Sequence, residues 1–221
     1  MLGENNKFIC DTIIYDFDGT LYDSFLGINK AFEESSVLVH KKKHSLSKKD
    51  IGPQLLELYK DAFGIKKEEE FSSFQKYFRH YYDEVFYNHG ELYANVEALL
   101  STFFERNINQ YVVSNKPQEV LQKIITENKI DKYFNGVSGH PHGGKTLSKK
   151  FERLKQIINQ NSLDPSRILV LGDTSEDFQM AVETRSYFVH ASYGYGVVNK
   201  ECISINSPLE ILNLIQHDSR S

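Results

Sequence analysis

Three short apolar segments of this chain each end in acidic or hydroxylic side chains, and each is followed by a segment with helical spacing. The apolar segments are FICDTIIYDF (8–17), NQYVVSN (109–115) and RILVLGD (167–173). Short apolar runs that stop at turn residues are typical of parallel strands covered on both faces. Strands that alternate with helices in this way predict an open α/β sheet, in which sites lie at the carboxyl ends of the strands.

The segments before and after these strands carry apolar residues on one helical face. They are KPQEVLQKIITEN (116–128), KKFERLKQII (149–158) and SEDFQMAVETR (175–185). Three- and four-residue spacing of apolar side chains indicates amphipathic helices that cover a sheet. YFVHA (187–191) and ISI (203–205) then predict later strands at the edge of the sheet.

The stretch from 22 to 88 lacks strand signals and is expected to be helical. Its main feature is a stripe of large side chains at three- and four-residue steps: Phe71, Phe74, Phe78, Tyr81, Tyr82 and Val85. Such a stripe predicts an amphipathic helix packed on its neighbours. We therefore expect an α/β core made of residues 1–21 and 89–221, with a helical insertion over 22–88.

Composition excludes several classes of function. The chain has 221 residues, 40% of them hydrophobic, and a net charge of −4, which gives no electrostatic case for binding nucleic acid or an anionic membrane. No apolar run is long enough to span a bilayer, and the polar start MLGENNKF does not resemble a signal peptide. Cys10 and Cys202 form no disulfide framework and are interpreted as small core residues. We expect a soluble, cytoplasmic protein.

Four carboxylates follow two of the predicted strands: Asp16, Asp18, Asp173 and Asp177. At ~4 Å and an effective dielectric constant near 20, each like-charge pair would cost about 4 kcal/mol. A single aspartate is commonly a helix cap or a turn residue, but that interpretation does not explain the whole set. A hard divalent cation would offset the repulsion, and carboxylate oxygens suit Mg²⁺.

The first strand end also carries groups suited to phosphate chemistry. Asp16 and Asp18 are two residues apart and point the same way if the strand geometry continues, so one could attack a phosphorus while the other handles a proton. Gly19 permits a tight turn and Thr20 offers a hydroxyl or a cap. Ser114 could hold a phosphoryl oxygen, together with the backbone N–H that follows it.

These motifs resemble a known family. DFDGTLYDS (16–24), VVSNK (112–116) and LGDTSEDFQMA (171–181) are similar, in order, to motifs one, two and four of the haloacid dehalogenase superfamily, in its phosphoglycolate-phosphatase-like branch. ELYANVEALL (91–100) and SYGYG (192–196) extend the similarity. The resemblance implies a Rossmann-like core, a mobile helical cap formed by the insertion, and Mg²⁺-dependent phosphoryl transfer through an aspartyl-phosphate.

The resemblance also implies roles for individual residues. Asp16 corresponds to the nucleophile and a Mg²⁺ ligand. Asp18 corresponds to the general acid/base, with its backbone carbonyl on the metal. Asp173 corresponds to an acidic metal ligand, and Asp177 to a second or outer ligand. The residues that would bind the substrate phosphate are Gly19, Thr20, Ser114, Asn115 and Lys150.

The family's third motif is a lysine that neutralises the nucleophile and the phosphate. Lys150 has the best spacing toward Asp173, and Lys145 is the alternative if the chain carries a short insertion. Lys149 fits neither helical phase. His140 and His142 lie in GHPHGG, which is interpreted as a glycine-rich loop because no third nitrogen or sulfur ligand is evident.

The resulting hypothesis is a phosphatase that hydrolyses a small phosphomonoester, such as a phosphoglycolate-like or sugar phosphate. The partner would be a small phosphorylated metabolite, and the chain would act as a monomer or homodimer. The alternatives are a phosphosugar mutase similar to β-phosphoglucomutase, a non-catalytic interaction protein on the same fold, and a receiver-like phosphoacceptor domain. The sequence does not name the substrate.

Overall fold

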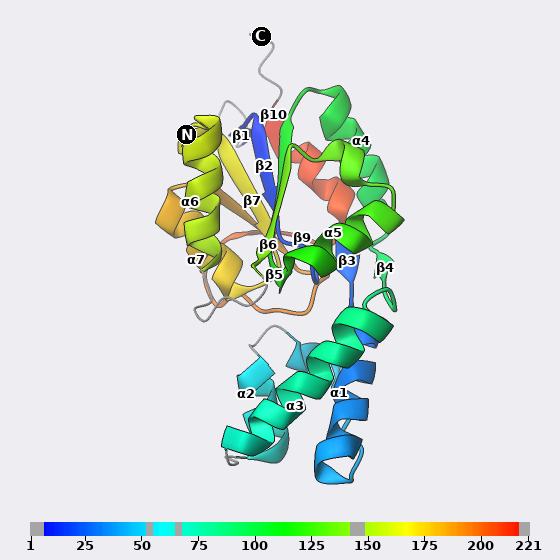
Figure 1. Ribbon diagram of the computed structural model, residues 1–221. Helices are drawn as coiled ribbons and strands as arrows, with labels where there is room; N and C mark the ends of the chain where they lie inside the picture. The colour runs from blue at the N-terminus through cyan, green and yellow to red at the C-terminus, as the bar shows by residue number, and fades with distance from the viewer. Residues whose placement is uncertain (1–6, 52–54, 65–67, 142–148, 217–221) are drawn as a thin grey trace. The chain divides into compact units, whose positions relative to one another are not determined.

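The computed structural model describes residues 7–51, 55–64, 68–141 and 149–216 (Figure 1). The chain divides into two compact units, one formed by Met1–Tyr22 with Leu92–Ser221 and the other by Asp23–Glu91. The insertion expected from the sequence spans 22–88. At the two points where the chain passes between the units, β3 (Tyr22–Asp23) and β4 (Glu91–Leu92) pair as a two-stranded sheet.

A six-stranded parallel sheet forms the centre of the first unit, in the order β6-β5-β2-β7-β8-β9. Its strands are β2 (Thr12–Tyr15), β5 (Asn109–Pro117), β6 (Gly136–His140), β7 (Ile168–Gly172), β8 (Tyr187–Ala191) and β9 (Ile203–Ile205). The predicted open parallel α/β sheet is therefore confirmed.

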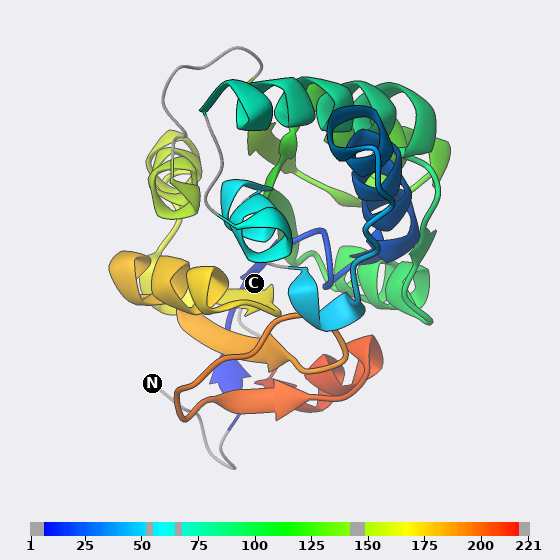
Figure 2. The same cartoon turned by 90° about the horizontal axis from the view of Figure 1, so that it is seen from below.

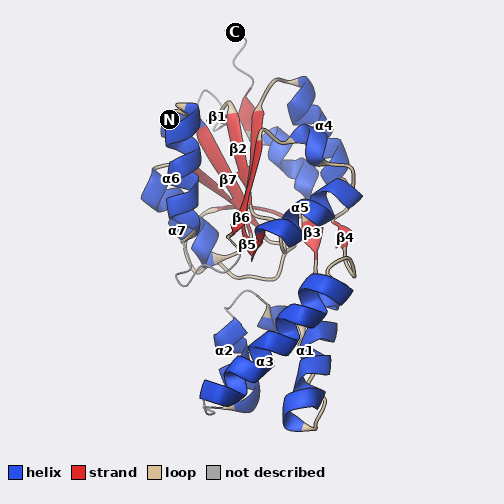
Figure 3. Cartoon of the chain, viewed as in Figure 1, coloured by secondary structure: helices blue, strands red, loops and turns tan. Residues whose placement is uncertain are grey.

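Helices cover both faces of this sheet (Figure 3). The helices on one face are α6 (Lys150–Asn161) and α7 (Ser175–Thr184), and those on the other are α4 (Val96–Glu105), α5 (Gln118–Glu127) and the 3-10 helix η5 (Pro208–Asn213). Ile14 and Val170 of the sheet pack with Leu154 of α6 and Met180 of α7 in one buried cluster. Burial from both sides explains why β2 and β7 are almost continuously apolar.

The first predicted strand is divided in the structure. β1 (Phe8–Ile9) pairs with β10 (Ile215–Gln216) in a separate two-stranded sheet, and β2 begins only at Thr12. Asp11 explains the break, because its half-exposed carboxylate forms an ion pair with Arg167 at 2.6 Å instead of continuing the buried strand. A single strand over 8–17 was therefore wrong.

The strand β6 was not predicted from the sequence. Gly139 and His140 of the GHPHGG segment end this strand, so the interpretation of a loop was wrong there, and His142 lies outside the described residues. The two glycines in five residues weaken the strand signal. β8 was expected at an edge, but it lies between β7 and β9, and the sheet ends at β9.

The second unit consists of helices over much of its length. They are α1 (Phe25–His40), the 3-10 turn η1 (Lys48–Asp50), α2 (Leu55–Phe63), α3 (Glu68–His80) and η2 (Tyr81–Phe86), which is a π-helix. α1 packs along α3 (Figure 2). Phe32 of α1 contacts Phe74 of α3, with ring centroids 4.9 Å apart, and both side chains are buried.

The predicted aromatic stripe continues from α3 to Tyr82 and fails at Val85. Phe74, Phe78 and Tyr82 are buried, whereas Val85 is 44% exposed. The cause is the π-helical turn over Tyr81–Phe86, which takes up more residues per turn than an α-helix and so changes the face on which the next residues lie. The buried residue at this end of the unit is instead Tyr87.

The two cysteines, which the sequence predicts to be small core residues, differ in burial. Cys10 is buried, and burial together with the Asp11 carboxylate raises its pKa to about 12, whereas Cys202 is partly exposed. Both are free thiols.

In the part of the chain that the structure describes, every helix is too short or too polar to cross a bilayer.

Candidate active site

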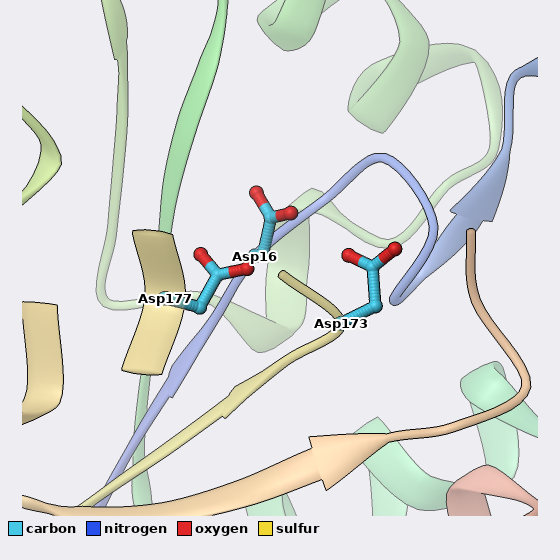
Figure 4. Close-up of side chains that lie close together, drawn as sticks. All are labelled: Asp16, Asp173 and Asp177. Carbon is cyan, nitrogen blue, oxygen red and sulfur yellow. The ribbon is translucent and has the colours of Figure 1, made fainter. Parts of the chain in front are cut away.

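Strand register brings the polar strand ends together. Tyr15 of β2 pairs with Val112 of β5 on one side and with Leu171 of β7 on the other. The carboxyl ends of these three parallel strands therefore lie at the same end of the sheet. Asp16 comes from β2, Asp173 follows β7, and Asp177 lies in the first turn of α7 (Figure 4).

Asp16 is almost completely buried, with 3% of its surface exposed. Its backbone N–H donates to the carbonyl of Leu171, which fixes the start of the loop. Its Oδ1 lies 2.7 Å from Nζ of Lys150, which is also buried and lies 2.8 Å from Oδ1 of Asp177. One lysine therefore bridges carboxylates from two different elements.

Asp173 is held by the backbone of the 192–196 loop. The N–H groups of Tyr195 and Gly196 donate to its Oδ2 at 2.8 and 3.0 Å. The Thr20 hydroxyl lies 3.4 Å from the other carboxylate oxygen. The SYGYG segment thus has a local role, because it orients the carboxylate that follows β7.

Asp177 is fixed by the N-terminus of its own helix. Its Oδ2 accepts hydrogen bonds from the N–H of Thr174 at 3.0 Å and from the Thr174 hydroxyl at 2.6 Å, as part of a capping box. Gly172 lies so close to Asp177 that a Cβ at that position would overlap its side chain. The cap therefore leaves Oδ1 of Asp177 directed toward Lys150.

The three buried carboxylates oppose one another electrostatically. One oxygen each from Asp16, Asp173 and Asp177 lie within 4.8 Å of one another. Burial and then the charge of Asp177 raise the pKa of Asp16 well above its usual value, although Lys150 opposes the shift. Burial and Asp177 also raise the pKa of Asp173, to about 6. For Lys150, burial lowers the pKa, but the charges of Asp16 and Asp177 outweigh it and raise the value overall.

This donor set fits a hard divalent cation. It offers carboxylate oxygens from three buried side chains, and the single positive charge of Lys150 does not balance them. Oxygen donors of this kind suit Mg²⁺ or a similar ion and disfavour softer metals. The residues present can therefore hold the metal that the sequence predicts.

Asp18 lies apart from the triad of acidic side chains. Its Oδ1 is 3.1 Å from Nζ of Lys116, and its side chain is 24% exposed. The turn that carries it depends on Gly19, which has a positive φ of 82° and packs against Asp173. The predicted contribution of Asp18 to metal binding, through its backbone carbonyl, stays a prediction.

The second strand end joins two neighbouring helices. Ser114 is buried, and its carbonyl accepts a hydrogen bond at 3.0 Å from Nη2 of Arg153 on α6. Asn115 is exposed, and its amide oxygen accepts from the same Nη2 at 3.0 Å while its amide nitrogen donates to Glu176 of α7 at 2.7 Å. Asn115 thus connects β5 with both helices, a structural partnership beside its predicted role with phosphate.

The structure distinguishes among the candidate lysines in part. Lys150 points into the site, Lys149 is exposed at the N-terminus of α6, and Lys145 lies outside the described residues. The sequence placed Lys116 at the second strand end without a role of its own, and Arg153 was not predicted as a site residue. The sequence signal for Lys116 was its place at the end of the VVSNK motif. The signal for Arg153 was its spacing, because it lies three residues after Lys150 and so close to it on the same helix.

Comparison with known proteins identifies the family. The family model described as haloacid dehalogenase-like hydrolase matches residues 13–191. A phosphoglycolate phosphatase from Photobacterium profundum is 24% identical over 91% of this chain and 90% of its own length. A 5'-nucleotidase from Pseudomonas aeruginosa is 23% identical over 83% of each chain.

A solved structure gives the same result. The crystal structure of a predicted phosphoglycolate phosphatase from Haemophilus somnus is 25% identical, with a TM-score of 0.80 over 97% of this chain and 100% of the other. Fold, motif order and family match therefore agree. The chain belongs to the haloacid dehalogenase-like hydrolases, as a phosphoglycolate-phosphatase-like member.

Proposed function

We propose that this hydrolase is a Mg²⁺-dependent phosphatase that acts on a small phosphomonoester through an aspartyl-phosphate on Asp16. The observation that carries the proposal is the buried Asp16 carboxylate, which lies beside Lys150 and within the Asp16–Asp173–Asp177 cluster. A buried carboxylate between a cation and two further acids is poorly explained as a structural residue. It is well suited to meet a phosphoryl group together with a metal ion.

Asp16, Asp173 and Asp177 would hold Mg²⁺. The bound ion would neutralise charge on the phosphoryl oxygens and favour the ionised form of the Asp16 carboxylate. The raised pKa of Asp16 supports a need for such compensation. Lys150 would supply the remaining positive charge from the side of α6.

The chain's own residues would carry out two transfers. An oxygen of Asp16 would attack the phosphorus and displace the alcohol, which gives the covalent intermediate. Asp18 would give a proton to the departing alkoxide and then take one from the water that releases phosphate from Asp16. Phosphoryl transfer depends mainly on positioning and charge neutralisation, which this set of residues can provide.

Several groups would hold the phosphate. Ser114 is buried at the end of β5, and its hydroxyl would donate to a phosphoryl oxygen. The other expected contacts come from Gly19, Thr20, Asn115 and Lys150. The helical unit would act as a cap that selects the substrate and excludes water during turnover.

The relatives narrow the substrate class without naming the substrate. Their names refer to phosphoglycolate phosphatases and a 5'-nucleotidase, and both names indicate phosphate monoesters of small molecules. We therefore propose a small phosphorylated metabolite as substrate. The predicted cytoplasmic location and a monomeric or homodimeric state belong to the same hypothesis.

The test is phosphate release from a panel that contains 2-phosphoglycolate, sugar phosphates and nucleoside 5'-monophosphates, each with Mg²⁺ and with EDTA. We expect Mg²⁺-dependent release that Asp16→Asn abolishes and that Asp131→Asn, an exposed aspartate in the 3-10 turn after α5, leaves unchanged. Appreciable turnover by Asp16→Asn would refute the nucleophile. Isomerisation that requires a bisphosphate primer would instead indicate a mutase.

A further inference from the structure

A second buried lysine, Lys116, lies beside the site and contacts Asp18 rather than Asp16. Lys116 follows β5 residues Ser114 and Asn115, and only 1% of its side chain is exposed. Its Nζ lies 3.1 Å from Oδ1 of Asp18. The two aspartates of the first motif thus have separate lysines, Lys150 for Asp16 and Lys116 for Asp18.

An irregularity in β5 accounts for the direction of Lys116. The register between β5 and β6 shifts between Val113 and Pro117, which marks a bulge. Bulges turn a side chain away from the face that regular alternation would give it. Gln118 stabilises this end of the strand, because its side chain accepts from the Gly139 N–H and donates to the Val137 carbonyl at 3.3 Å.

The bulge also joins Lys116 to Ser114. The backbone N–H of Lys116 donates to the Ser114 hydroxyl at 3.2 Å. Lys116 therefore contacts both the proposed phosphate-holding hydroxyl, through its backbone, and the proposed acid/base, through its side chain. Burying an ammonium group is costly unless it is paired, so the position of the lysine strongly favours contact with Asp18.

We propose that Lys116 is a positioning residue that holds the Asp18 carboxylate in place for proton transfer, an inference that rests on the proposed function. The lysine engages Oδ1. We assign proton transfer to the other carboxylate oxygen, Oδ2. Because the contact with Lys116 fixes Oδ1, it would also orient Oδ2 toward the substrate. The side chain of Asp18 is 24% exposed, so packing does not enclose it on every side, and the contact with Lys116 adds a fixed point.

The balanced steps show where this contact matters. As Asp16 bonds to phosphorus, the phosphorus–oxygen bond to the leaving group breaks, and Oδ2 of Asp18 gives its proton to that oxygen. In the second step the Asp18 carboxylate takes a proton from water, the water oxygen bonds to phosphorus, and Asp16 leaves as a carboxylate. Inorganic phosphate is released and Asp18 again carries its proton.

The chemistry of the leaving group distinguishes a positioning role of Lys116 from a merely structural one. An alkyl phosphate such as 2-phosphoglycolate needs a proton on its leaving oxygen, whereas 4-nitrophenyl phosphate releases a stabilised anion and does not. A lysine that acts through Asp18 should therefore affect formation of the phosphoenzyme from the alkyl substrate only. A lysine that only stabilises the fold should affect both substrates alike.

The experiment measures single-turnover formation of the phosphoenzyme from each probe with wild type, Lys116→Met and Lys116→Gln. We expect the rate with 2-phosphoglycolate to fall about 100-fold, the size of a typical general-acid contribution. The burst of 4-nitrophenol should change less than about threefold. Lys155→Met, at an exposed position on α6, is the matched control and should change neither rate.

A double-mutant cycle then tests whether Asp18 is the partner. In an Asp18→Asn background, Lys116→Met should cause no further loss with 2-phosphoglycolate, because the group that it positions is gone. Additive losses would overturn the proposal. The backbone contact from Lys116 to Ser114 survives all of these substitutions, so the cycle reports on the side chain alone.

The remaining outcomes are also decisive. Equal loss with both probes, in variants whose circular dichroism is unchanged, would make Lys116 a structural residue and overturn the proposal. Failure of both lysine variants to fold would do the same. If wild type does not turn over 2-phosphoglycolate, the alkyl phosphate of the panel that it hydrolyses best takes its place as the probe. If wild type releases phosphate from no member of the panel, the proposed function fails and the inference about Lys116 fails with it. Wild-type turnover that Asp16→Asn abolishes shows that the proposed function holds, so that the results with the Lys116 variants then test Lys116 alone.

Discussion

Lys150 connects two acidic side chains that come from different parts of the chain. Its ammonium group lies 2.7 Å from Asp16 and 2.8 Å from Asp177, and all three side chains are buried. Removing one partner of a buried ion pair is costly, because the opposite charge remains without compensation. The charge state of the site at neutral pH therefore depends on this residue.

We predict that Lys150→Met lowers kcat for the best phosphomonoester by at least about 100-fold, since charge on the transferring phosphoryl group would lose a fixed cation. In EDTA the variant should also lose about 3 kcal/mol of unfolding free energy, as found for broken buried pairs. Steady-state kinetics and urea unfolding measure the two effects.

Lys149→Met is the matched control for this prediction. Lys149 is the neighbouring lysine, but it is exposed at the start of α6. Its removal should leave kcat within about twofold and change stability by less than about 0.5 kcal/mol. Equal effects of the two substitutions would contradict the assignment of the third-motif lysine to position 150.

At the residue scale the sequence predicts which acids gather and offers Lys150, with Lys145 as the alternative, as their cation, but it assigns no role to Lys116 or Arg153. The sequence predicts that three acids lie close together, because each follows a strand or opens a helix at the same end of a parallel sheet: Asp16, Asp173 and Asp177. Lys116 and Arg153 could not be predicted in this way, because an isolated lysine or arginine is usually solvated. Their burial depends on a bulge and on helix packing, which no local pattern encodes.

The N-terminus of α7 holds Asp177, a proposed metal ligand, through the same contacts that cap the helix. Thr174 donates two hydrogen bonds to Oδ2 of Asp177, so the cap and the site share one carboxylate. Losing the hydroxyl would free the Asp177 side chain to rotate away from Lys150. Local helix capping is therefore coupled to the geometry proposed for metal binding.

We predict that Thr174→Val lowers stability by about 1 kcal/mol, the usual cost of losing an N-cap. It should also raise the Mg²⁺ concentration needed for half-maximal activity by about tenfold or more. Thr174→Ser keeps the hydroxyl and should restore both values. Mg²⁺ titrations of activity, combined with urea unfolding, check the prediction, and a normal Mg²⁺ requirement in the valine variant would contradict it.

The π-helical turn after α3 gives a second prediction at this scale. Phe78 lies before the turn and is 6% exposed, whereas Val85 lies within it and is 44% exposed. Phe78→Ala should lower the unfolding free energy by about 3 kcal/mol through the cavity it leaves. Val85→Ala should change it by less than about 0.5 kcal/mol. Urea unfolding compares the two variants. Equal losses of unfolding free energy would contradict the change of buried face at the π-helical turn.

Regular periodicity is the part of the fold that the sequence predicts well. The strands β2, β5 and β7 and the helices α5, α6 and α7 follow from it, because each buries a face with a fixed repeat. The misses are departures from a repeat. The break at Asp11, the glycine-containing β6 and the turn before Val85 depend on contacts with distant residues or on backbone geometry.

At the scale of the whole molecule, the proposed metal site opposes folding until an ion is bound. Three carboxylates from β2, β7 and α7 must be buried near one another when the sheet forms. In the unfolded chain they are separate and hydrated. A cation that binds only the folded state would stabilise it by mass action, by about 2.7 kcal/mol at a concentration 100 times its Kd.

This stabilisation should depend on pH with a defined sign. The pKa of Asp173 is raised to about 6 in the folded protein from an ordinary value of 3.8, because of burial and the charge of Asp177. A raised carboxylate pKa means that the metal-free fold prefers the protonated form. Its stability therefore falls as pH rises from about 4 through 6, and the penalty is fully present above that range.

Mg²⁺ would bind the ionised carboxylates, so the stabilisation by Mg²⁺ should grow over the same pH interval. We predict that the difference in Tm between Mg²⁺ and EDTA is small at pH 5 and reaches about 5–10 °C at pH 7.5, from the binding free energy above and the usual shift of about 2–4 °C per kcal/mol. Thermal unfolding at constant ionic strength measures it. Asp173→Asn should reduce the pH dependence, because one titrating ligand is gone while Asp16, whose pKa is also raised, remains. An equal Tm difference at both pH values in the wild type would show that ionisation of Asp173 does not limit binding.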